Sequence, residues 1–228
     1  LGMLDELLDL WGTLREDLET RVVILRGAGE KGFCGGVDIK EVKEFTDDMI
    51  NLPFLYHWQT RLGELEYMMR KIPQPIICLV HGAATGAGFS FALASDIRII
   101  TPDARFSAYY VNVGLGGADM SSSYFLPRLI GAGRAYDMLL TGRFMLADEA
   151  MQLGFASYCV ERDQLLDKGL EVARMIKEKD PLAIRLTKEA VNQNLDSSSM
   201  ERVLTIENRN QSMMFMHNMH QGRYFIGK

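Results

Sequence analysis

Glycines and other small residues crowd one segment of the chain, Val80 to Ala92, where a buried strand is expected to run into a helix. Small residues let a ligand approach the backbone closely. The first turn of a helix presents free N–H groups and a partial positive charge, which favour an anion or a polarised carbonyl oxygen. In an oxyanion hole, each such donor contributes about 3 kcal/mol in the transition state. The segment therefore indicates either an oxyanion hole or tight packing of a helix on a strand.

A second glycine-rich segment, Gly27 to Gly32, has the spacing G-x-G-x-x-G after an expected strand. A dinucleotide site with this spacing requires a helix to open at the third glycine. The residues that follow, Phe33 to Gly36, are poor helix formers because two of them are glycines. We therefore expect a loop here and no nucleotide-dependent oxidoreductase. The sequence also lacks a GxxxxGK[ST] motif.

The elements that position these segments follow from the pattern of apolar residues. Strands are expected at Arg21–Leu25, Ile76–Val80, Ile97–Thr101 and Ala156–Val160. Helices are expected at Leu1–Glu19, Asp48–Lys71, Tyr124–Leu140 and Ala147–Leu153, and then at Asp163–Lys179, Pro181–Asn194 and Ser198–Met219. Because strand signals stop near Glu161, we predict an α/β core over residues 1–161 and a helical C-terminal subdomain over residues 162–228.

Composition excludes several classes of protein. The 228 residues carry a net charge of −5 and no basic cluster, so nucleic acid is not an expected partner. No apolar run approaches the ~20 residues that cross a bilayer, so we expect no membrane insertion. Three widely separated cysteines predict neither disulfides nor a zinc site, and they favour a reducing compartment such as the cytoplasm. The chain starts inside an expected helix, so we expect the natural protein to continue before Leu1.

Two segments together resemble the crotonase (enoyl-CoA hydratase/isomerase) family. Phe33 to Ile39 is similar to the first oxyanion-hole segment of that family, and Val80 to Ala92 is similar to the second. The likeness continues through Ser95–Ile99, Leu126–Gly131 and Leu140–Gly154, so it covers nearly the whole chain. The family's N-terminal strand and its coenzyme A contacts are absent from the sequence, which agrees with a chain that starts late.

The resemblance implies a ββα-repeat spiral core with a helical C-terminal region, assembled as a homotrimer or hexamer. It implies an enzyme that binds an acyl-CoA thioester and stabilises its enolate, with coenzyme A arriving as part of the substrate and no separate cofactor. The backbone N–H groups of Val37 and Ala87 are expected to meet the thioester oxygen. Substrate contacts are expected from Gly36, Asp38, Ile39, Lys40 and Gly86, where Lys40 either meets a phosphate or stays solvated.

The sequence departs from the hydratase pattern at two positions. A hydratase of this family uses two carboxylates to activate water and to deliver a proton to carbon. Aligned by motif, those positions hold Ser90 and Tyr110. Both are poor general bases at neutral pH, since even the unperturbed pKa of tyrosine is ~10. We therefore expect an enzyme that is not a standard two-glutamate hydratase.

Asp119 is the candidate replacement acid/base, because some isomerases and dehalogenases of the family carry a catalytic aspartate near this position. Its alternative role is to cap the following helix. Tyr109 and Tyr110 are expected either as hydrogen-bond donors or as the wall of an acyl pocket. The leading hypothesis is thus a lyase or isomerase that acts on acyl-CoA. The alternative is a catalytically weak acyl-CoA-binding protein or a structural subunit with the same fold.

Overall fold

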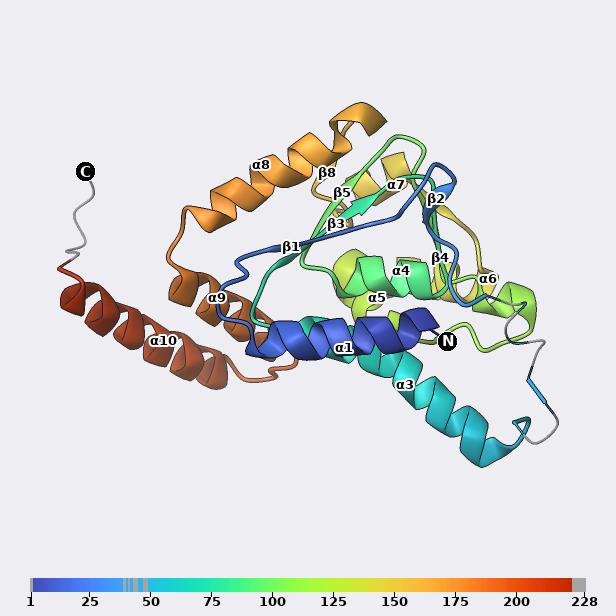
Figure 1. Cartoon of the computed structure of the whole chain (residues 1–228), viewed down its shortest axis with the longest axis horizontal. Helices are drawn as coiled ribbons and strands as arrows, with labels where there is room; N and C mark the ends of the chain where they lie inside the picture. The colour runs from blue at the N-terminus through green and yellow to red at the C-terminus, as the bar shows by residue number, and fades with distance from the viewer. Residues whose placement is uncertain (1, 39, 41, 43–44, 47–48, 223–228) are drawn as a thin grey trace.

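The computed structural model describes residues 2–38, 40, 42, 45–46 and 49–222, so the predicted substrate contact Ile39 lies outside the described residues. The described part of the chain forms two four-stranded sheets with helices packed around them (Figure 1). None of the helices in these ranges is long and apolar enough to span a membrane.

The first sheet is parallel throughout and lies at the centre of the molecule. Its strands, in spatial order, are β1 (Val23–Arg26), β3 (Ile76–Val80), β5 (Ile97–Ile100) and β8 (Tyr158–Cys159). Every residue of β3 is buried, as expected of an uninterrupted apolar run in a sheet that is covered on both faces. The strands predicted from apolar runs are therefore confirmed, with ends that shift by a few residues.

The second sheet consists of short strands that the sequence pattern did not predict. Its strands, in spatial order, are β2 (Gly32–Cys34), β4 (Ala83–Thr85), β6 (Arg105–Ser107) and β7 (Met145–Leu146), and only β7 runs antiparallel to its neighbour. The loop predicted for the segment that includes Gly32 is wrong at β2. Runs of two or three residues are too short to produce a strand signal.

The two sheets are built by a repeating path of the chain. Strands β1, β3 and β5 in the first sheet are each followed by a strand of the second sheet, and helices then lead to the next pair. The ββα-repeat core predicted from the resemblance is confirmed by this order and by the structures to which the chain is similar. Because each repeat crosses between the sheets, the starts of β2 and β4 are held side by side.

The helices of the core are α1 (Gly2–Glu16), α3 (Leu52–Lys71), α4 (Ala87–Ala94), α5 (Ser122–Ile130), α6 (Ala132–Thr141) and α7 (Ala147–Gln152). After β8 come α8 (Leu165–Lys177), α9 (Pro181–Asn194) and α10 (Met200–His220). All the predicted helices are present. The expected helix at Tyr124–Leu140 is divided into α5 and α6 by Gly131, whose φ of 83° suits a residue without a side chain.

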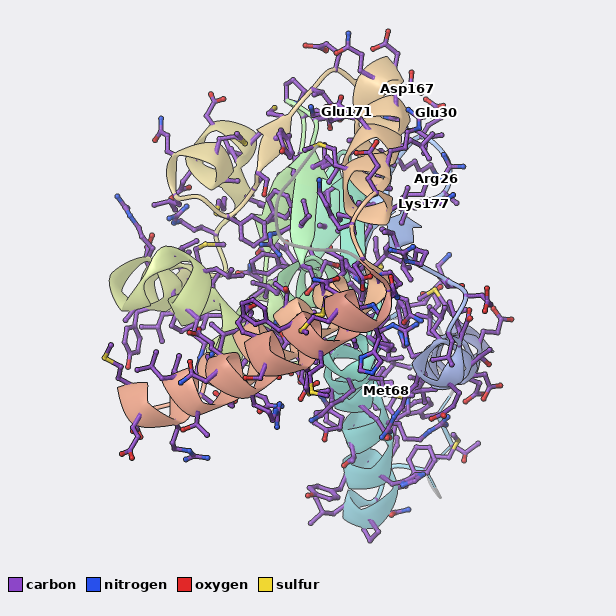
Figure 2. All side chains as sticks on the ribbon, turned by 90° about the vertical axis from the view of Figure 1, so that its left-hand side faces the viewer. Arg26, Glu30, Met68, Asp167, Glu171 and Lys177 are labelled. Carbon is purple, nitrogen blue, oxygen red and sulfur yellow. The ribbon has the colours of Figure 1, made fainter. Side chains whose placement is uncertain are left out.

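The C-terminal helices differ in how they contact the core. Leu165 and Val172 of α8 pack against Ile77, Leu79 and Ile99 of the first sheet. The charged residues Asp167, Glu171 and Lys177 are carried on the same helix (Figure 2). Helix α10 packs on α9 and projects away from the sheets (Figure 1). Helix α9 is joined to the core, because its buried Lys188 pairs with Asp96 at 2.8 Å and donates to the Gln74 carbonyl at 2.8 Å. Two of the helices beyond the last strand therefore pack on the core, and α10 extends from them.

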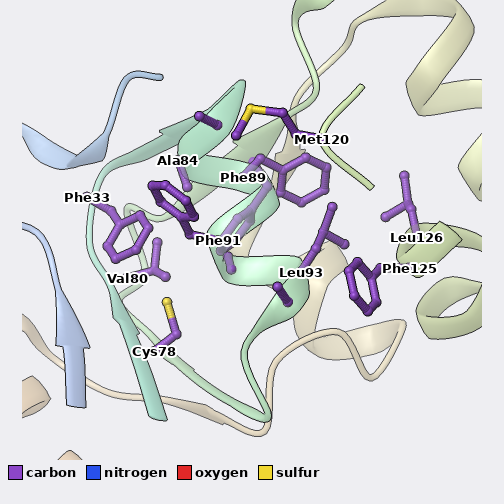
Figure 3. Close-up of a cluster of buried hydrophobic side chains, with 14 of the residues drawn as sticks. Phe33, Cys78, Val80, Ala84, Phe89, Phe91, Leu93, Met120, Phe125 and Leu126 are labelled. Carbon is purple, nitrogen blue, oxygen red and sulfur yellow. The ribbon is translucent and has the colours of Figure 1, made fainter. Parts of the chain in front are cut away.

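Helix α4 is the centre of the hydrophobic core, and all eight of its residues are buried. The ring of Phe89 on α4 lies 6.0 Å from the ring of Phe106 and 5.8 Å from the ring of Phe155, centroid to centroid. Figure 3 shows the buried side chains that surround this helix, among them Met120 from the segment before α5. Helices α1 and α3 pack together, and α3 also packs on α4 (Figure 1).

Gly88 allows α4 to approach β2 more closely than any side chain would permit. A Cβ atom added at Gly88 would lie 2.2 Å from the carbonyl oxygen of Cys34. We expect Gly88→Ala to lower the free energy of unfolding by about 1–3 kcal/mol through overpacking. Gly133→Ala is the control, because a Cβ there meets nothing within 4 Å and alanine favours a helix. Equal stability of both variants in urea titrations would contradict this account of the packing.

Candidate active site

The two predicted oxyanion segments meet where β2 and β4 end. The strands are paired with Cys34 opposite Ala84, and the Thr85 hydroxyl donates a hydrogen bond to the Gly35 carbonyl at 3.0 Å. A Cβ atom added at Gly36 would lie 3.2 Å from the Ala87 nitrogen, and Gly36 has a φ of 95°. Both the close approach and the backbone conformation favour glycine at this position. The structure thus brings Gly36 directly against the first residue of α4.

Ala87 opens α4 after a glycine in an unusual conformation. Gly86 has a φ of 53° and a ψ of −123°, which turns the chain sharply from β4 into the helix. The Gly86 N–H donates to the Ser107 carbonyl at 3.1 Å, and no side chain caps the helix. The N–H groups in the first turn of a helix have no partner within the helix. The buried residue Ala87 therefore offers an N–H group at the positive end of the α4 dipole.

A cavity of about 240 Å³ opens next to these backbone groups. Its lining comes from the first oxyanion segment, from α1, α3 and α4, and from the segment before α5. The lining residues are Met3, Leu4, Leu7, Gly36, Val37, Asp38, Trp58, Leu62, Leu65, Ala87, Phe91 and Met120. Most of these side chains are apolar, so the cavity suits an apolar chain with one polar group placed against the backbone.

Ser90 and Tyr110 lie together although they are far apart in the sequence. Ser90 is on the fully buried α4, and Tyr110 begins the 3-10 turn η1 (Tyr110–Val113). Their hydroxyl oxygens are 3.3 Å apart, within hydrogen-bond distance. Burial raises the pKa of Tyr110 well above its usual value, so the phenol stays protonated at neutral pH. The pair can hydrogen-bond to a neighbouring group, but neither hydroxyl is a base.

Asp119 is partly buried in the strained segment before α5. The two residues after it, Met120 and Ser121, have φ values of 44° and 63°, which are costly for residues other than glycine. The Asp119 carboxylate accepts hydrogen bonds from the Met120 N–H at 2.7 Å and from the Gln59 side chain on α3. Burial raises the pKa of Asp119, and the Met120 N–H offsets this in part.

The alternative role of Asp119 as a helix cap differs from what the structure shows. Helix α5 starts at Ser122 after the N-cap residue Ser121, and no side chain caps it. A capping aspartate would accept a hydrogen bond from a helix N–H group. Here the Asp119 backbone N–H instead donates to the Ser122 hydroxyl at 3.1 Å. The carboxylate is therefore held by Gln59 and Met120 and is not used by the helix.

Glu66 is a buried carboxyl that the sequence analysis missed. Its side chain on α3 has no exposed surface, and neither carboxyl oxygen is hydrogen-bonded to another described residue. Burial, with a smaller contribution from the nearby charge of Asp119, raises the pKa of Glu66 to about 9. A signal was present in the sequence, because Glu66 interrupts the apolar stripe formed by Leu62, Leu65 and Met69. The helical periodicity placed a carboxyl on the face that packs into the core.

The remaining predicted contacts lie outside the cavity or at its rim. Asp38 lines the cavity and accepts a hydrogen bond from the Lys40 N–H at 2.8 Å, and both residues are exposed. Tyr109 is also exposed and packs against Phe144, with 5.9 Å between ring centroids. Tyr109 is not among the residues that line the cavity, whereas its neighbour Tyr110 is buried.

Metal ligands do not gather anywhere in the ranges that the structure covers, since no three His, Cys, Asp or Glu residues there are placed to hold an ion. The groups that the structure does bring together are backbone N–H donors, two hydroxyls and two carboxyls. This set can polarise a carbonyl and move a proton.

Comparison with known proteins matches the chain to the enoyl-CoA hydratase/isomerase family over residues 1–225. A probable enoyl-CoA hydratase of Mycobacterium leprae is 34% identical over 223 residues, which cover 92% of this chain and 74% of the relative. The structure of an enoyl-CoA hydratase from Bacillus anthracis superposes with a TM-score of 0.86 at 30% identity, covering 97% of this chain and 86% of that one. A monofunctional enoyl-CoA isomerase from M. smegmatis superposes with a TM-score of 0.71 at 35% identity, covering 88% and 84%.

The hydrogen bond between Ser90 and Tyr110 is testable through stability. Tyr110→Phe removes one partner of a buried pair, so we expect the free energy of unfolding to fall by about 0.5–1.5 kcal/mol. Tyr109→Phe is the matched control, because an exposed hydroxyl should change it by less than about 0.5 kcal/mol. Urea unfolding of the three proteins measures both values. A loss of the same size in the two variants would show that the buried pair adds nothing.

Proposed function

The chain belongs to the enoyl-CoA hydratase/isomerase family, and we propose that it polarises the carbonyl of an acyl-CoA thioester between the backbone N–H groups of Val37 and Ala87. One observation carries this proposal. Gly36 and Ala87 come from separate segments and approach each other at the wall of an apolar cavity, where Val37 also lies. An acyl chain in that cavity would direct its thioester oxygen toward the start of α4.

Two such donors favour the loss of a proton from the carbon next to the thioester. When that C–H bond breaks, its electron pair moves into the carbonyl and the oxygen becomes negative. The N–H groups and the positive end of the α4 dipole stabilise that charge in a site with little water. The enolate is thus the intermediate that this site favours.

We propose Asp119 as the base that removes the proton. Its pKa is raised by burial, which makes the carboxylate a stronger proton acceptor than an exposed aspartate. In a 3-enoyl thioester, loss of the proton from carbon 2 gives a dienolate. Return of the proton to carbon 4 forms a C–H bond there and replaces the C3=C4 double bond by C2=C3, with no net gain or loss of atoms. The hydroxyls of Ser90 and Tyr110 stay protonated at neutral pH, so neither can act as a base. Because hydration in this family uses two carboxylates, their absence at these positions favours isomerisation over the addition of water.

Coenzyme A enters this proposal as part of the substrate, with no separate cofactor. Asp38 at the rim and the exposed Lys40 lie where the chain leaves the cavity, so the nucleotide end of coenzyme A would extend over this surface. Lys40 carries the positive charge that a phosphate there would meet. Tyr109 is exposed on a different segment and contributes nothing to the apolar wall in this proposal.

We also propose self-association as a homotrimer or a hexamer. Helix α10 contacts α9 and exposes large apolar side chains to solvent, including Leu204, Met213 and Met216. Exposed apolar side chains on a projecting helix favour contact with another protein surface. A second copy of the same chain is the partner that supplies such a surface in closed symmetry.

The proposed chemistry can be tested without knowing the natural acyl group. In D2O, the protein should exchange the hydrogens next to the thioester of a saturated short-chain acyl-CoA, as followed by the loss of their NMR signal. Asp119→Asn should slow this exchange by about 10²–10⁴-fold, the usual contribution of a positioned base. Asp167→Asn, an exposed change on α8 (Figure 2), should leave the rate unchanged.

A second arm separates the two candidate reactions. A 3-enoyl-CoA should be converted into its 2-enoyl isomer, while hydration of crotonyl-CoA stays near background. Efficient hydration would contradict the assignment of isomerisation. Binding of acyl-CoA without exchange or isomerisation would instead favour a catalytically weak binding protein with this fold.

A further inference from the structure

Glu66 occupies a buried position, where a carboxyl group lowers the stability of the fold. Its side chain is fully buried, and neither oxygen is hydrogen-bonded to another described residue. A buried carboxylate without partners pays a large desolvation cost, so such a group is expected to remain protonated. A leucine at this point of the α3 stripe would avoid the cost. The carboxyl therefore calls for an explanation beyond packing.

The surroundings of Glu66 are those of the candidate active site. Leu62 and Leu65 of α3 line the same cavity as Val37 and Ala87, and Glu66 follows them on the helix. Glu66 and Asp119 are close enough for the charge of Asp119 to raise the pKa of Glu66, and both carboxyls raise the pKa of Tyr110. Glu66 is thus a buried carboxyl on the helix that lines the cavity, although it is not itself among the lining residues.

Few other ionisable groups in the described ranges face Glu66. Helix α4, which packs on α3, has no ionisable side chain. The charged residues of α1 are all exposed, namely Asp5, Glu6, Asp9, Arg15 and Glu16. On α3 itself, Arg61 pairs with Asp5, Arg70 pairs with Asp96, and Glu64 is exposed. Asp119 and Tyr110 are therefore the groups whose ionisation is coupled to that of Glu66.

Glu66 and Asp119 lie in different environments, so their carboxyl groups differ in proton affinity. Burial, with no hydrogen bond from another described residue, raises the pKa of Glu66 to about 9. Asp119 is partly exposed and accepts hydrogen bonds from Gln59 and Met120, which favour its charged form. Carboxyls whose environments separate their proton affinities in this way take different roles in one site.

We propose that Glu66 is a positioning residue that acts through Asp119, remaining a neutral carboxylic acid so that Asp119 carries the single negative charge of the pair. This inference rests on the proposed function. A second negative charge in this buried wall would repel the charge that forms on the thioester oxygen, and would raise the free energy of the enolate. The reaction should therefore be fast only while Glu66 is protonated.

The test is the pH dependence of the exchange reaction in D2O in the wild type and in Glu66→Gln. In the wild type, the rate should fall by about tenfold per pH unit once Glu66 ionises, above pH about 9. Glu66→Gln is permanently neutral, so it should keep its rate at neutral pH within about threefold and lose the alkaline decline. The decline at acidic pH, where Asp119 takes up a proton, should be the same in both proteins.

Glu64→Gln is the matched control, because Glu64 is an exposed glutamate on the same helix and should leave the alkaline decline in place. The proposal is overturned if Glu66→Gln keeps the wild-type alkaline decline, or if it loses the reaction at neutral pH while remaining folded. If Asp119→Asn exchanges as fast as the wild type, Asp119 is not the base. That result would contradict the proposed function and is distinct from a failure of the Glu66 proposal.

Thermal unfolding checks the ionisation of Glu66 without any substrate. In the unfolded chain a glutamate releases its proton near pH 4.5, whereas in the folded chain Glu66 keeps it to pH about 9. The stability contributed by the bound proton is therefore fully present below pH 4.5 and is lost as the pH rises to about 9. The melting temperature of Glu66→Gln should exceed that of the wild type by a margin that grows over this window. A constant margin would contradict a buried, protonated Glu66.

Discussion

The close approach of Gly36 to the first residue of α4 is the constraint on which the rest of the site depends. A side chain at Gly36 would come within 3.2 Å of the Ala87 nitrogen, and a side chain at Gly88 would collide with the Cys34 carbonyl. The pairing of β2 with β4 fixes this approach, and the repeating path between the two sheets produces that pairing. The small residues are thus required for the end of a strand and the start of a helix to lie this close together.

The polar groups around this point differ in whether they can gain or lose a proton. Backbone N–H groups cannot titrate, and the Tyr110 phenol keeps its proton because burial raises its pKa. Asp119 and Glu66 are carboxyls near this point, and burial raises the pKa of each, that of Glu66 to about 9. In the proposed function, such a site holds one negative charge at rest and passes it to a substrate. That property distinguishes it from a cavity that only binds an acyl chain.

Sequence patterns predicted the long elements and the family, and they failed where contacts are short or distant. Strand β3 and helix α9 have the predicted bounds, because one is an unbroken apolar run and the other begins at a proline. Strands β2, β4 and β6 were missed, since a run of three residues is too short to show periodicity. Glu66 was missed because its proposed role depends on Asp119 and Tyr110, which come near it only in the folded chain.

The central claim is that the thioester carbonyl is polarised at the start of α4, and the vibration of that carbonyl reports it directly. An acyl-CoA labelled with ¹³C at the thioester carbonyl can be compared free and bound by isotope-edited infrared difference spectroscopy. Two N–H donors on the oxygen weaken the C=O bond, so the account predicts a lower stretching frequency in the bound thioester. An unchanged frequency at full occupancy of the site would contradict it.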